Sequence, residues 1–132
     1  MTASRRGDLL DPACPTRQML DRIGSKWVSM LFLALGSEDE VRFAELRRRA
    51  PGISSKVLAD TLRVLERDGF VVRRVEPTVP PAVHYGLTPL GRSLTGPLAV
   101  LRDWAETHMA AVDDARSAYD SRAPVGTPKS ML

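Results

Sequence analysis

Charged side chains recur at helical spacing in the middle of this sequence. One lysine, one aspartate and two arginines follow one another at i, i+4, i+7 and i+11, so a helix would place them on one face: Lys56, Asp60, Arg63 and Arg67. The residues that recur on the opposite side are mostly apolar: Val57, Leu58, Thr61, Leu62 and Leu65. Lysine and arginine bind phosphate oxygens and the acceptor edge of guanine. The pattern therefore indicates either a surface for nucleic acid or an ordinary solvated face of a helix.

The positive charge of the chain is concentrated in the same region. The 132 residues carry a net charge of +3, which is common among proteins that never meet nucleic acid. The segment from Arg42 to Arg74 holds nine basic and four acidic residues, so its net charge is about +5 and that of the remainder about −2. A basic segment in an otherwise slightly acidic chain favours a surface that meets phosphates.

Two helices are predicted before this segment. Residues 14–24 form the first, with Cys14 or Asp11 as its cap, Pro15 in its first turn and Gly24 at its end. The second follows the capping residue Ser25, and nearly every residue over 27–35 is apolar. We therefore expect the second helix to lie at the centre of the core and to be covered on most sides.

The next elements have the order of a winged helix-turn-helix. After a polar turn and a short extended piece, a short helix over 43–50 and a longer one over 55–68 are joined by a tight turn at 51–54. Ser54 or Ser55 caps the longer helix, and Gly69 ends it. The segments 69–77 and 82–87 are rich in β-branched and aromatic residues and predict a two-stranded hairpin with a proline-rich tip. The fold class is thus mainly α with a small β-hairpin.

A long helix is predicted after the hairpin. It starts at Thr88 and Pro89, is kinked or divided at Gly96 and Pro97, and is followed by a last helical piece over 113–122. Its apolar stripe is too apolar for an exposed terminal helix, so we expect burial against a two-fold mate: Leu98, Leu101, Trp104 and Ala105. The domain organisation expected is one domain over 13–121 between flexible segments at 1–12 and 122–132.

The docking geometry of helix-turn-helix proteins selects candidate DNA contacts. The N-terminal part of the second helix enters the major groove, and the candidates there are Ser54, Ser55, Lys56, Ala59, Asp60 and Arg63. Asp60 can accept from cytosine N4, but phosphates repel a carboxylate, so pairing with Lys56 at i, i+4 is favoured for it.

Two further arginines are candidates for contact with the DNA backbone. Arg48 lies on the preceding helix, and Arg74 lies where the hairpin leaves the body. Strand alternation allows only one of Arg73 and Arg74 to face DNA. The tip has no lysine or arginine, so we expect weak contacts there.

The composition argues against several other classes. Cys14 is the only cysteine and His84 and His108 are the only histidines, which leaves no set for a Cys/His metal site and no internal disulfide. No apolar run reaches the roughly 18 residues that span a bilayer, and the N-terminus lacks the apolar middle of a signal peptide. We therefore expect a cytoplasmic protein without membrane contact. No nucleophile with a base and no phosphate-binding glycine loop is visible, so no enzymatic activity and no cofactor are expected.

Several short motifs together resemble one family. Cys-Pro at 14–15, Gly-Ser-Lys-Trp at 24–27, Leu-Glu-Arg-Asp-Gly at 65–69 and Tyr-Gly-Leu-Thr-Pro-Leu-Gly at 85–91 are similar to the HxlR-type bacterial winged-helix regulators, relatives of the MarR-like group. The resemblance covers about residues 14–120. It implies a homodimeric DNA-binding regulator whose terminal helices form the interface. Ala82 stands where such proteins often carry a basic residue and His84 where an acidic one is common, so the wing departs from the pattern.

Cys14 has two interpretations. The resemblance implies oxidant or electrophile sensing, because several relatives sense through a cysteine at this position. A thiol at a helix N-terminus, with Arg17, Arg22 and Lys26 near it in sequence, has its thiolate favoured. The alternative is a small residue packed at the helix start, since free cysteine is often buried and inert. Any disulfide would join Cys14 to the partner's Cys14 or to a small thiol.

The function expected from these observations is a transcription regulator. We expect a homodimer that recognises a palindromic operator in double-stranded DNA, acts as a repressor by blocking polymerase, and responds to an oxidant or a small-molecule effector. The alternative is a winged helix used only for protein contact or ligand capture. A steep salt dependence of duplex binding would distinguish the first from the second.

Overall fold

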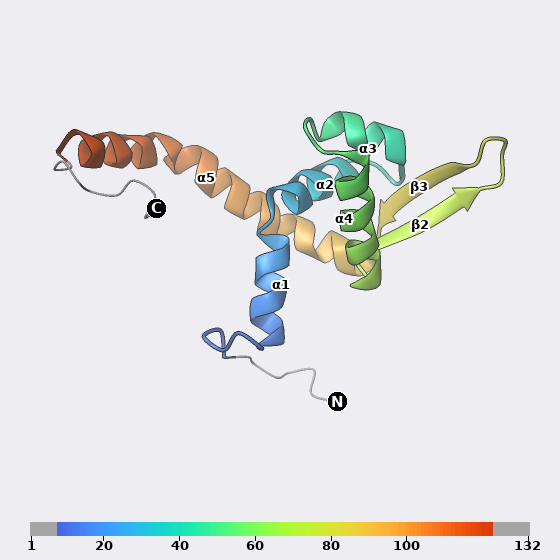
Figure 1. Cartoon of the computed structure of the whole chain (residues 1–132), viewed down its shortest axis with the longest axis horizontal. Helices are drawn as coiled ribbons and strands as arrows, with labels where there is room; N and C mark the ends of the chain where they lie inside the picture. The colour runs from blue at the N-terminus through green and yellow to red at the C-terminus, as the bar shows by residue number, and fades with distance from the viewer. Residues whose placement is uncertain (1–7, 123–132) are drawn as a thin grey trace. The chain divides into compact units, whose positions relative to one another are not determined.

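The computed structural model describes residues 8–122, which form five α-helices and three short β-strands (Figure 1). Contacts divide the chain at Gly96 and Pro97 into two units. The first unit holds four helices, the sheet and the start of the fifth helix, and the second holds the rest of the fifth helix. Residues 1–7 and 123–132 of the predicted flexible segments lie outside the described residues. No helix within 8–122 is long and apolar enough to cross a membrane.

The first two helices begin and end at the positions that their capping residues predict. α1 (Pro15–Ile23) has Cys14 at its N-cap and Gly24 at its C-cap. α2 (Lys26–Gly36) begins after Ser25, whose hydroxyl oxygen accepts from the backbone N–H of Trp27 at 3.2 Å. Leu31 and Leu35 of α2 are fully buried, but Leu33 is 57% exposed and Met30 is also exposed. The expectation that α2 is covered on most sides is therefore wrong for its outer face within this single chain.

The helix-turn-helix is formed by α3 (Phe43–Arg49) and α4 (Ser55–Arg67). The hydroxyl oxygen of Ser54 caps α4 by accepting from the backbone N–H of Val57 at 3.1 Å. Gly69 follows α4 with φ +85°, a conformation that favours glycine and ends the helix. The buried side of α4 consists of Leu58, Leu62 and Leu65. Val57 was expected on that side and is instead 40% exposed, because it lies on the flank of the helix.

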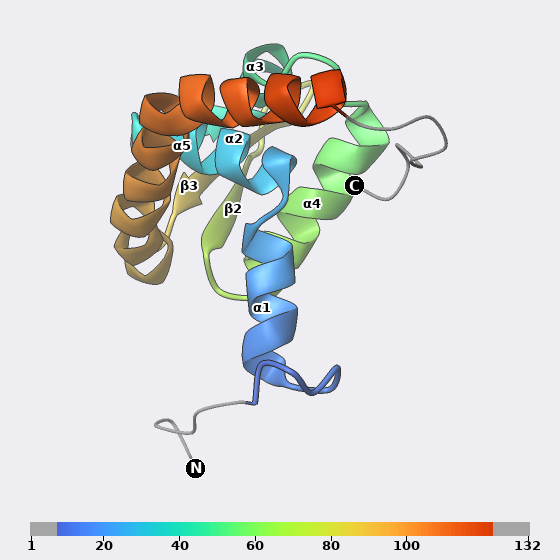
Figure 2. The same cartoon turned by 90° about the vertical axis from the view of Figure 1, so that its left-hand side faces the viewer.

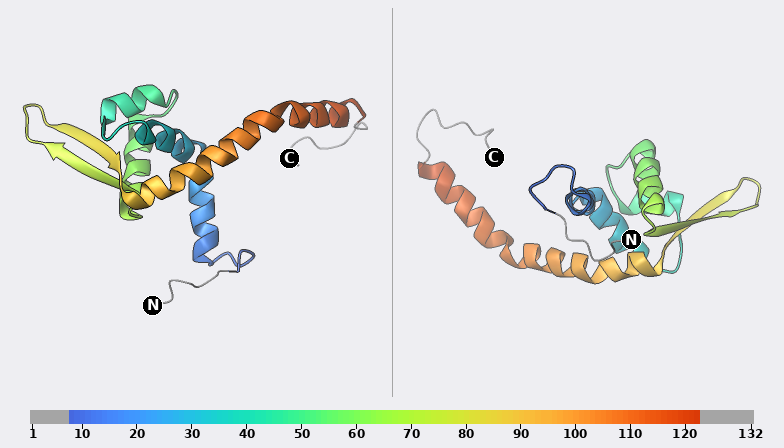
Figure 3. Two further views of the ribbon diagram at one scale, coloured as in Figure 1. Left: turned by 180° about the vertical axis from the view of Figure 1, so that it is seen from behind. Right: turned by 90° about the horizontal axis from the view of Figure 1, so that it is seen from below.

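The hairpin is part of a three-stranded antiparallel sheet. β2 (Val71–Glu76) pairs with β3 (Ala82–Leu87), as predicted, and β1 (Val41–Arg42) adds a third strand in the order β1-β3-β2. β1 pairs Val41 with Tyr85 and Arg42 with His84. The hairpin extends well past α3 and α4 (Figure 3). The middle of the hairpin is thus paired with the residues that lead directly into α3.

The last helix, α5 (Pro89–Arg122), is continuous and contains Pro97. Of the two alternatives expected at this point, a kink or a division, the division is absent, and the last helical piece over 113–122 belongs to the same helix. The boundary between the two units falls at that proline. Thr88 caps the helix: its hydroxyl oxygen accepts from the backbone N–H of Gly91 at 3.0 Å, and the same hydroxyl donates to the carbonyl of Gly69. A Cβ on Gly91 would lie 2.2 Å from the carbonyl oxygen of Phe70. Helix and hairpin therefore approach each other more closely here than a side chain permits.

Candidate nucleic-acid interface

The polar face of α4 lies opposite its buried face, as its spacing predicts. Lys56 and Arg63 are exposed, and Asp60 lies between them on the same face. Residues on one flank of α4 line a hollow toward the hairpin, and those on the other flank line a groove toward α1. Figure 2 shows α4 with α1 and the hairpin strands around it. The face that carries the cations is thus left open to a partner.

Asp60 is shared by the two candidate base-contacting cations. Its Oδ2 accepts from Nζ of Lys56 at 3.0 Å, and its Oδ1 accepts from Nη1 of Arg63 at 2.8 Å. The hydrogen bonds from Arg63 and then from Lys56 hold the pKa of Asp60 below its ordinary value. The predicted pairing of Asp60 with Lys56 is present, and Arg63 adds a second partner that the i, i+4 rule did not include.

The small residues at the start of α4 take different positions. The Ser54 hydroxyl already accepts a hydrogen bond as the helix cap, while Ser55 is exposed in the first turn and Ala59 is half-buried. Ala59 lines the hollow beside the hairpin. Ser55 is therefore the serine whose hydroxyl is not used by the cap, and Ala59 lies at the edge that faces the wing.

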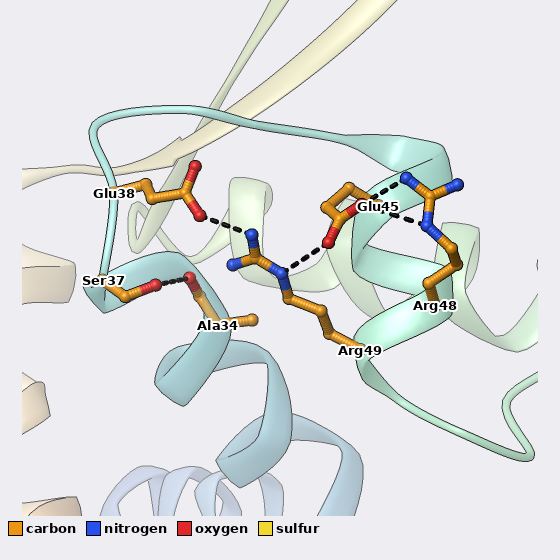
Figure 4. A network of polar contacts seen from close by, with 6 residues as sticks. All are labelled: Ala34, Ser37, Glu38, Glu45, Arg48 and Arg49. Atoms are coloured by element: carbon orange, nitrogen blue, oxygen red, sulfur yellow. Dashed lines mark hydrogen bonds and ion pairs between the residues drawn. The ribbon is translucent and has the colours of Figure 1, made fainter.

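Two of the three arginines of α3 are paired with glutamates (Figure 4). Nε of Arg48 donates to Glu45 at 3.0 Å, and Nε of Arg49 donates to the other oxygen of Glu45 at 2.8 Å. Arg49 also pairs with Glu38 in the loop before β1. Hydrogen bonds from Arg49 and then Arg48 lower the pKa of Glu45. Arg48, a predicted contact to the DNA backbone, is exposed, and its charge is already paired with that of Glu45.

Arg73 and Arg74 lie on opposite faces of the sheet. Nε and Nη2 of Arg74 both donate to Glu40, each at 2.8 Å, and this pairing lowers the pKa of Glu40. Arg73 pairs across the strands with Tyr85 and lies on the face that lines the hollow beside α4. Arg74, the predicted contact, is engaged by Glu40, whereas Arg73 is the arginine that lines the hollow. Strand alternation shows that the two arginines point to opposite faces of the sheet, but not which one points toward α4. The packing of the sheet on α4 decides this.

The outer part of the hairpin carries little positive charge. His84 Nε2 lies 3.0 Å from Oε1 of Glu76, so the histidine that departs from the family pattern has a neighbouring carboxylate. Ala82, at the other departure, is buried. Neither position carries a lysine or an arginine.

Cys14 is 4% exposed, and its side chain forms no capping hydrogen bond with α1. The three nearby cations have other partners. Arg17 donates to the carbonyl of Leu10 at 3.1 Å, Arg22 pairs with Asp68, and Nζ of Lys26 lies 4.7 Å from the centre of the Trp27 ring. Each of the three cations is therefore engaged with another group in the single chain.

The apolar stripe of α5 is open in this chain. Leu101 is 62% exposed, Trp104 is 55% exposed and stacks on His108 with ring centres 4.5 Å apart, Ala105 is exposed and Leu98 is half-exposed. The second unit thus presents large apolar side chains that its own residues leave uncovered. Within residues 8–122, no group of three or more histidine, cysteine or acidic side chains could hold a metal ion.

The helix-turn-helix, the wing and the polar face of α4 define a winged helix-turn-helix protein. The sequence model of the HxlR-like helix-turn-helix family matches residues 22–113. The chain belongs to this family of transcriptional regulators, and the predicted resemblance and fold class are confirmed.

The similar proteins are described as regulators. The uncharacterized HTH-type transcriptional regulator YtfH of Escherichia coli strain K12 is 42% identical over 117 residues, which are 86% of this chain and 92% of that protein. A solved structure described as the transcriptional regulator ytfH from Salmonella typhimurium has 40% identity and a TM-score of 0.78, and the match covers 85% of this chain and 99% of that one. The redox regulator HypR in its reduced form has 38% identity and a TM-score of 0.69, with 76% and 98% covered. This chain is accordingly an HTH-type transcriptional regulator and not an enzyme.

Proposed function

We propose that this regulator is a homodimer that reads a palindromic operator with α4 and represses transcription by occupying it. The observation that carries the proposal is the open polar face of α4, where Lys56 and Arg63 lie opposite the buried leucines. A good contact between such a side chain and a base is worth about 1 to 3 kcal/mol. Ser55, Asp60 and the other residues of the first two turns share that face or its edges.

The two-fold assembly is supported by the second unit. Leu101 and Trp104 are large apolar side chains on an exposed stripe of α5, and a second copy of the same stripe would cover them. Two copies of α4 would then meet half-sites about 34 to 36 Å apart, one turn of the duplex. Arg48 would add a contact to the DNA backbone from each α3.

An oxidant response is a further part of the proposal. HypR, to which this chain is similar, is described as a redox regulator. In this chain the thiol of Cys14 is buried, so a reagent reaches it only after α1 moves. Modification there would shift α1 against α2 and the partner chain, and a change in the separation of the two α4 helices would mismatch both half-sites together.

The experiment is alanine substitution on α4 with DNA selection. Wild-type protein first selects its duplex from a random-sequence pool. Lys56→Ala and Arg63→Ala are expected to lose most of the affinity for that duplex while remaining dimers in sedimentation. Arg67→Ala, on the same face but at the far end of the helix, is the matched control and is expected to lose much less. Unchanged affinity in both of the first two variants would contradict the role of α4.

The alternative function as a ligand-binding module has one supporting feature. A groove of about 440 Å³ runs between α1, α2 and α4, from Gln18 and Asp21 to Asp60 and Val64. Salt titration separates the two functions, because phosphate-driven binding weakens steeply as salt rises. A protein that selects no duplex at low salt would favour the groove.

A further inference from the structure

A hollow of about 360 Å³ lies between α4 and the hairpin that forms the wing. Three residues of α4 line one side of it, and one residue each of β2 and β3 lines the other: Ala59, Arg63, Glu66, Arg73 and Tyr85. Two arginines from separate elements therefore face the same space. The helix and the wing each supply one of these cations.

The shape of the hollow is fixed by its apolar members. Tyr85 is buried, and its ring lies 6.5 Å from the ring of Phe43 at a tilt of 48°. Ala59 has a side chain of one carbon, which leaves the space above it open. The register of the sheet sets Arg73 directly across from Tyr85. The two arginines thus lie beside a buried tyrosine ring and the small side chain of an alanine.

The charge of the hollow favours an anion. Arg74, the neighbour of Arg73, is held by both oxygens of Glu40, whereas Arg73 forms no ion pair within residues 8–122. Arg63 shares Asp60 with Lys56 and so keeps unused donors on its guanidinium. Glu66 also lines the hollow and opposes an anion, which leaves one positive charge in excess. Guanidinium groups bind phosphate oxygens through paired N–H donors.

The position of the hollow matches the path of one DNA strand. When α4 lies in a major groove, the wing beside it lies toward the adjacent minor groove, and a sugar-phosphate backbone separates the two grooves. That backbone must cross the junction of α4 and the hairpin. We propose that this hollow holds one backbone phosphate, which Arg73 and Arg63 bind between them. The inference rests on the proposed function and replaces Arg74 with Arg73 as the backbone contact of the hairpin. It also assigns the unused N–H donors of Arg63 to the phosphate, while Lys56 stays a candidate base contact.

The test compares adjacent arginines. Wild type, Arg73→Ala, Arg73→Lys and the control Arg74→Ala are titrated with the duplex selected by wild type and with an unrelated duplex, both of about 30 base pairs or three turns, over a range of salt concentrations. Arg73→Ala is expected to weaken binding about tenfold on both duplexes, because a phosphate contact carries no sequence information. It is also expected to reduce the slope of log affinity against log salt by about 0.9 for each phosphate that is no longer neutralised. Arg73→Lys retains the charge and most of the slope.

Glu66→Gln provides a test in the opposite direction. Removing this carboxylate is expected to tighten binding to both duplexes, and to do so less when Arg73 is already alanine, because the two residues act on the same phosphate. Thermal unfolding and sedimentation of each variant show whether fold and assembly are intact.

The outcomes separate this inference from the proposed function. If wild type selects and binds no duplex, the proposed function fails and the phosphate site with it. If wild type binds and Arg73→Ala leaves both affinity and salt slope unchanged, or matches Arg74→Ala, only the phosphate site is overturned. A loss confined to the selected duplex, with an unchanged salt slope, would make Arg73 a base contact and would also overturn the site.

Discussion

Arg63 and Asp60 lie one turn apart on α4, and Nη1 of Arg63 donates to Oδ1 of Asp60 at 2.8 Å. The second oxygen of the same carboxylate accepts from Lys56 at 3.0 Å. Both oxygens of Asp60 are therefore engaged, and the carboxylate fixes the direction of two cations on the exposed face. A base amino group can reach Asp60 only beside these bonds or in place of one of them. The three side chains act as one group in the free protein.

Asp60→Asn is expected to tighten binding to unrelated duplexes more than binding to the selected operator. The substitution keeps the size of the side chain but removes the negative charge that opposes phosphates and holds Lys56 and Arg63. The ratio of the two affinities should therefore fall. Fluorescence anisotropy titrations at one fixed salt concentration measure both. Asp113→Asn on α5 changes the net charge equally and is the control; the same tightening in both variants would mean that net charge alone is responsible.

The ion pairs of Glu45 predict a pH dependence of stability. Hydrogen bonds from Arg49 and then Arg48 hold the pKa of Glu45 below its ordinary value of 4.5 in the folded chain. Their contribution to the free energy of unfolding is therefore present above pH 4.5 and is lost as the pH falls through the lowered folded-state value. Because the group is exposed, the contribution is small and decreases with salt. The difference in thermal midpoint between wild type and Glu45→Gln should be largest at neutral pH and should shrink in acid; a constant difference would contradict this.

Leu101→Glu is expected to convert the proposed dimer to a folded monomer. A charge in the middle of an apolar two-fold contact leaves a carboxylate buried without a partner. Sedimentation at micromolar concentration gives the mass, and circular dichroism shows whether the helices remain. Ala110→Glu places the same charge on the opposite face of α5 and should stay dimeric. A wild-type protein that sediments as a monomer and still binds its operator would disprove the assembly.

Oxidant or electrophile treatment is expected to change the operator affinity of wild type and to leave Cys14→Ser unchanged. Serine keeps the approximate size of the thiol and removes its redox chemistry. Since the thiol is buried, modification should be slow, and mass spectrometry should detect it only as fast as α1 opens. If both proteins respond equally, or neither does, Cys14 is a packing residue and any effector acts elsewhere.

Two glycines of α5 give different expectations for stability. Gly91→Ala should lower the free energy of unfolding by about 1 to 3 kcal/mol or more, as overpacking does, because the new Cβ would lie 2.2 Å from the Phe70 carbonyl oxygen. Gly96→Ala meets nothing beyond its chain neighbours within 4 Å, but the ring of Pro97 disfavours the helical conformation for a preceding residue that has a Cβ. This offsets the gain of up to about 1 kcal/mol from the helical preference of alanine, so a much smaller change is expected. Urea unfolding measures both. Similar effects of the two substitutions would contradict the close approach of α5 to the end of α4.

Local chemistry was sufficient to predict most of the first unit. Ser25 and Ser54 cap the helices they were expected to cap, and the period of the leucines in α4 gives its buried side directly. These features depend on residues within one or two turns of each other. Capping hydrogen bonds and amphipathic spacing therefore carry their own information in the sequence.

Other features were left open by the local pattern of the sequence. β1 is two residues long and forms only because β3, more than 40 residues later, offers its free edge. Which of Arg73 and Arg74 faces α4 is decided by how the sheet packs, a choice that alternation alone leaves open. α5 continues through Pro97, although proline removes one backbone hydrogen bond. The helix has 34 residues, and its other hydrogen bonds offset this loss.

β1 pairs with only Tyr85 and His84 of the hairpin. The wing therefore has one part that is held by the third strand and one part that is not. The middle of the hairpin is paired with the two residues that lead into α3, whereas residues 77–81 at the tip lie beyond the third strand. Changes in the length or charge of the tip are therefore expected to leave the packing of α4 on the rest of the first unit unchanged. If α4 reads the operator as proposed, replacement of these few residues is expected to change the affinity for DNA while the sequence that is recognised stays the same.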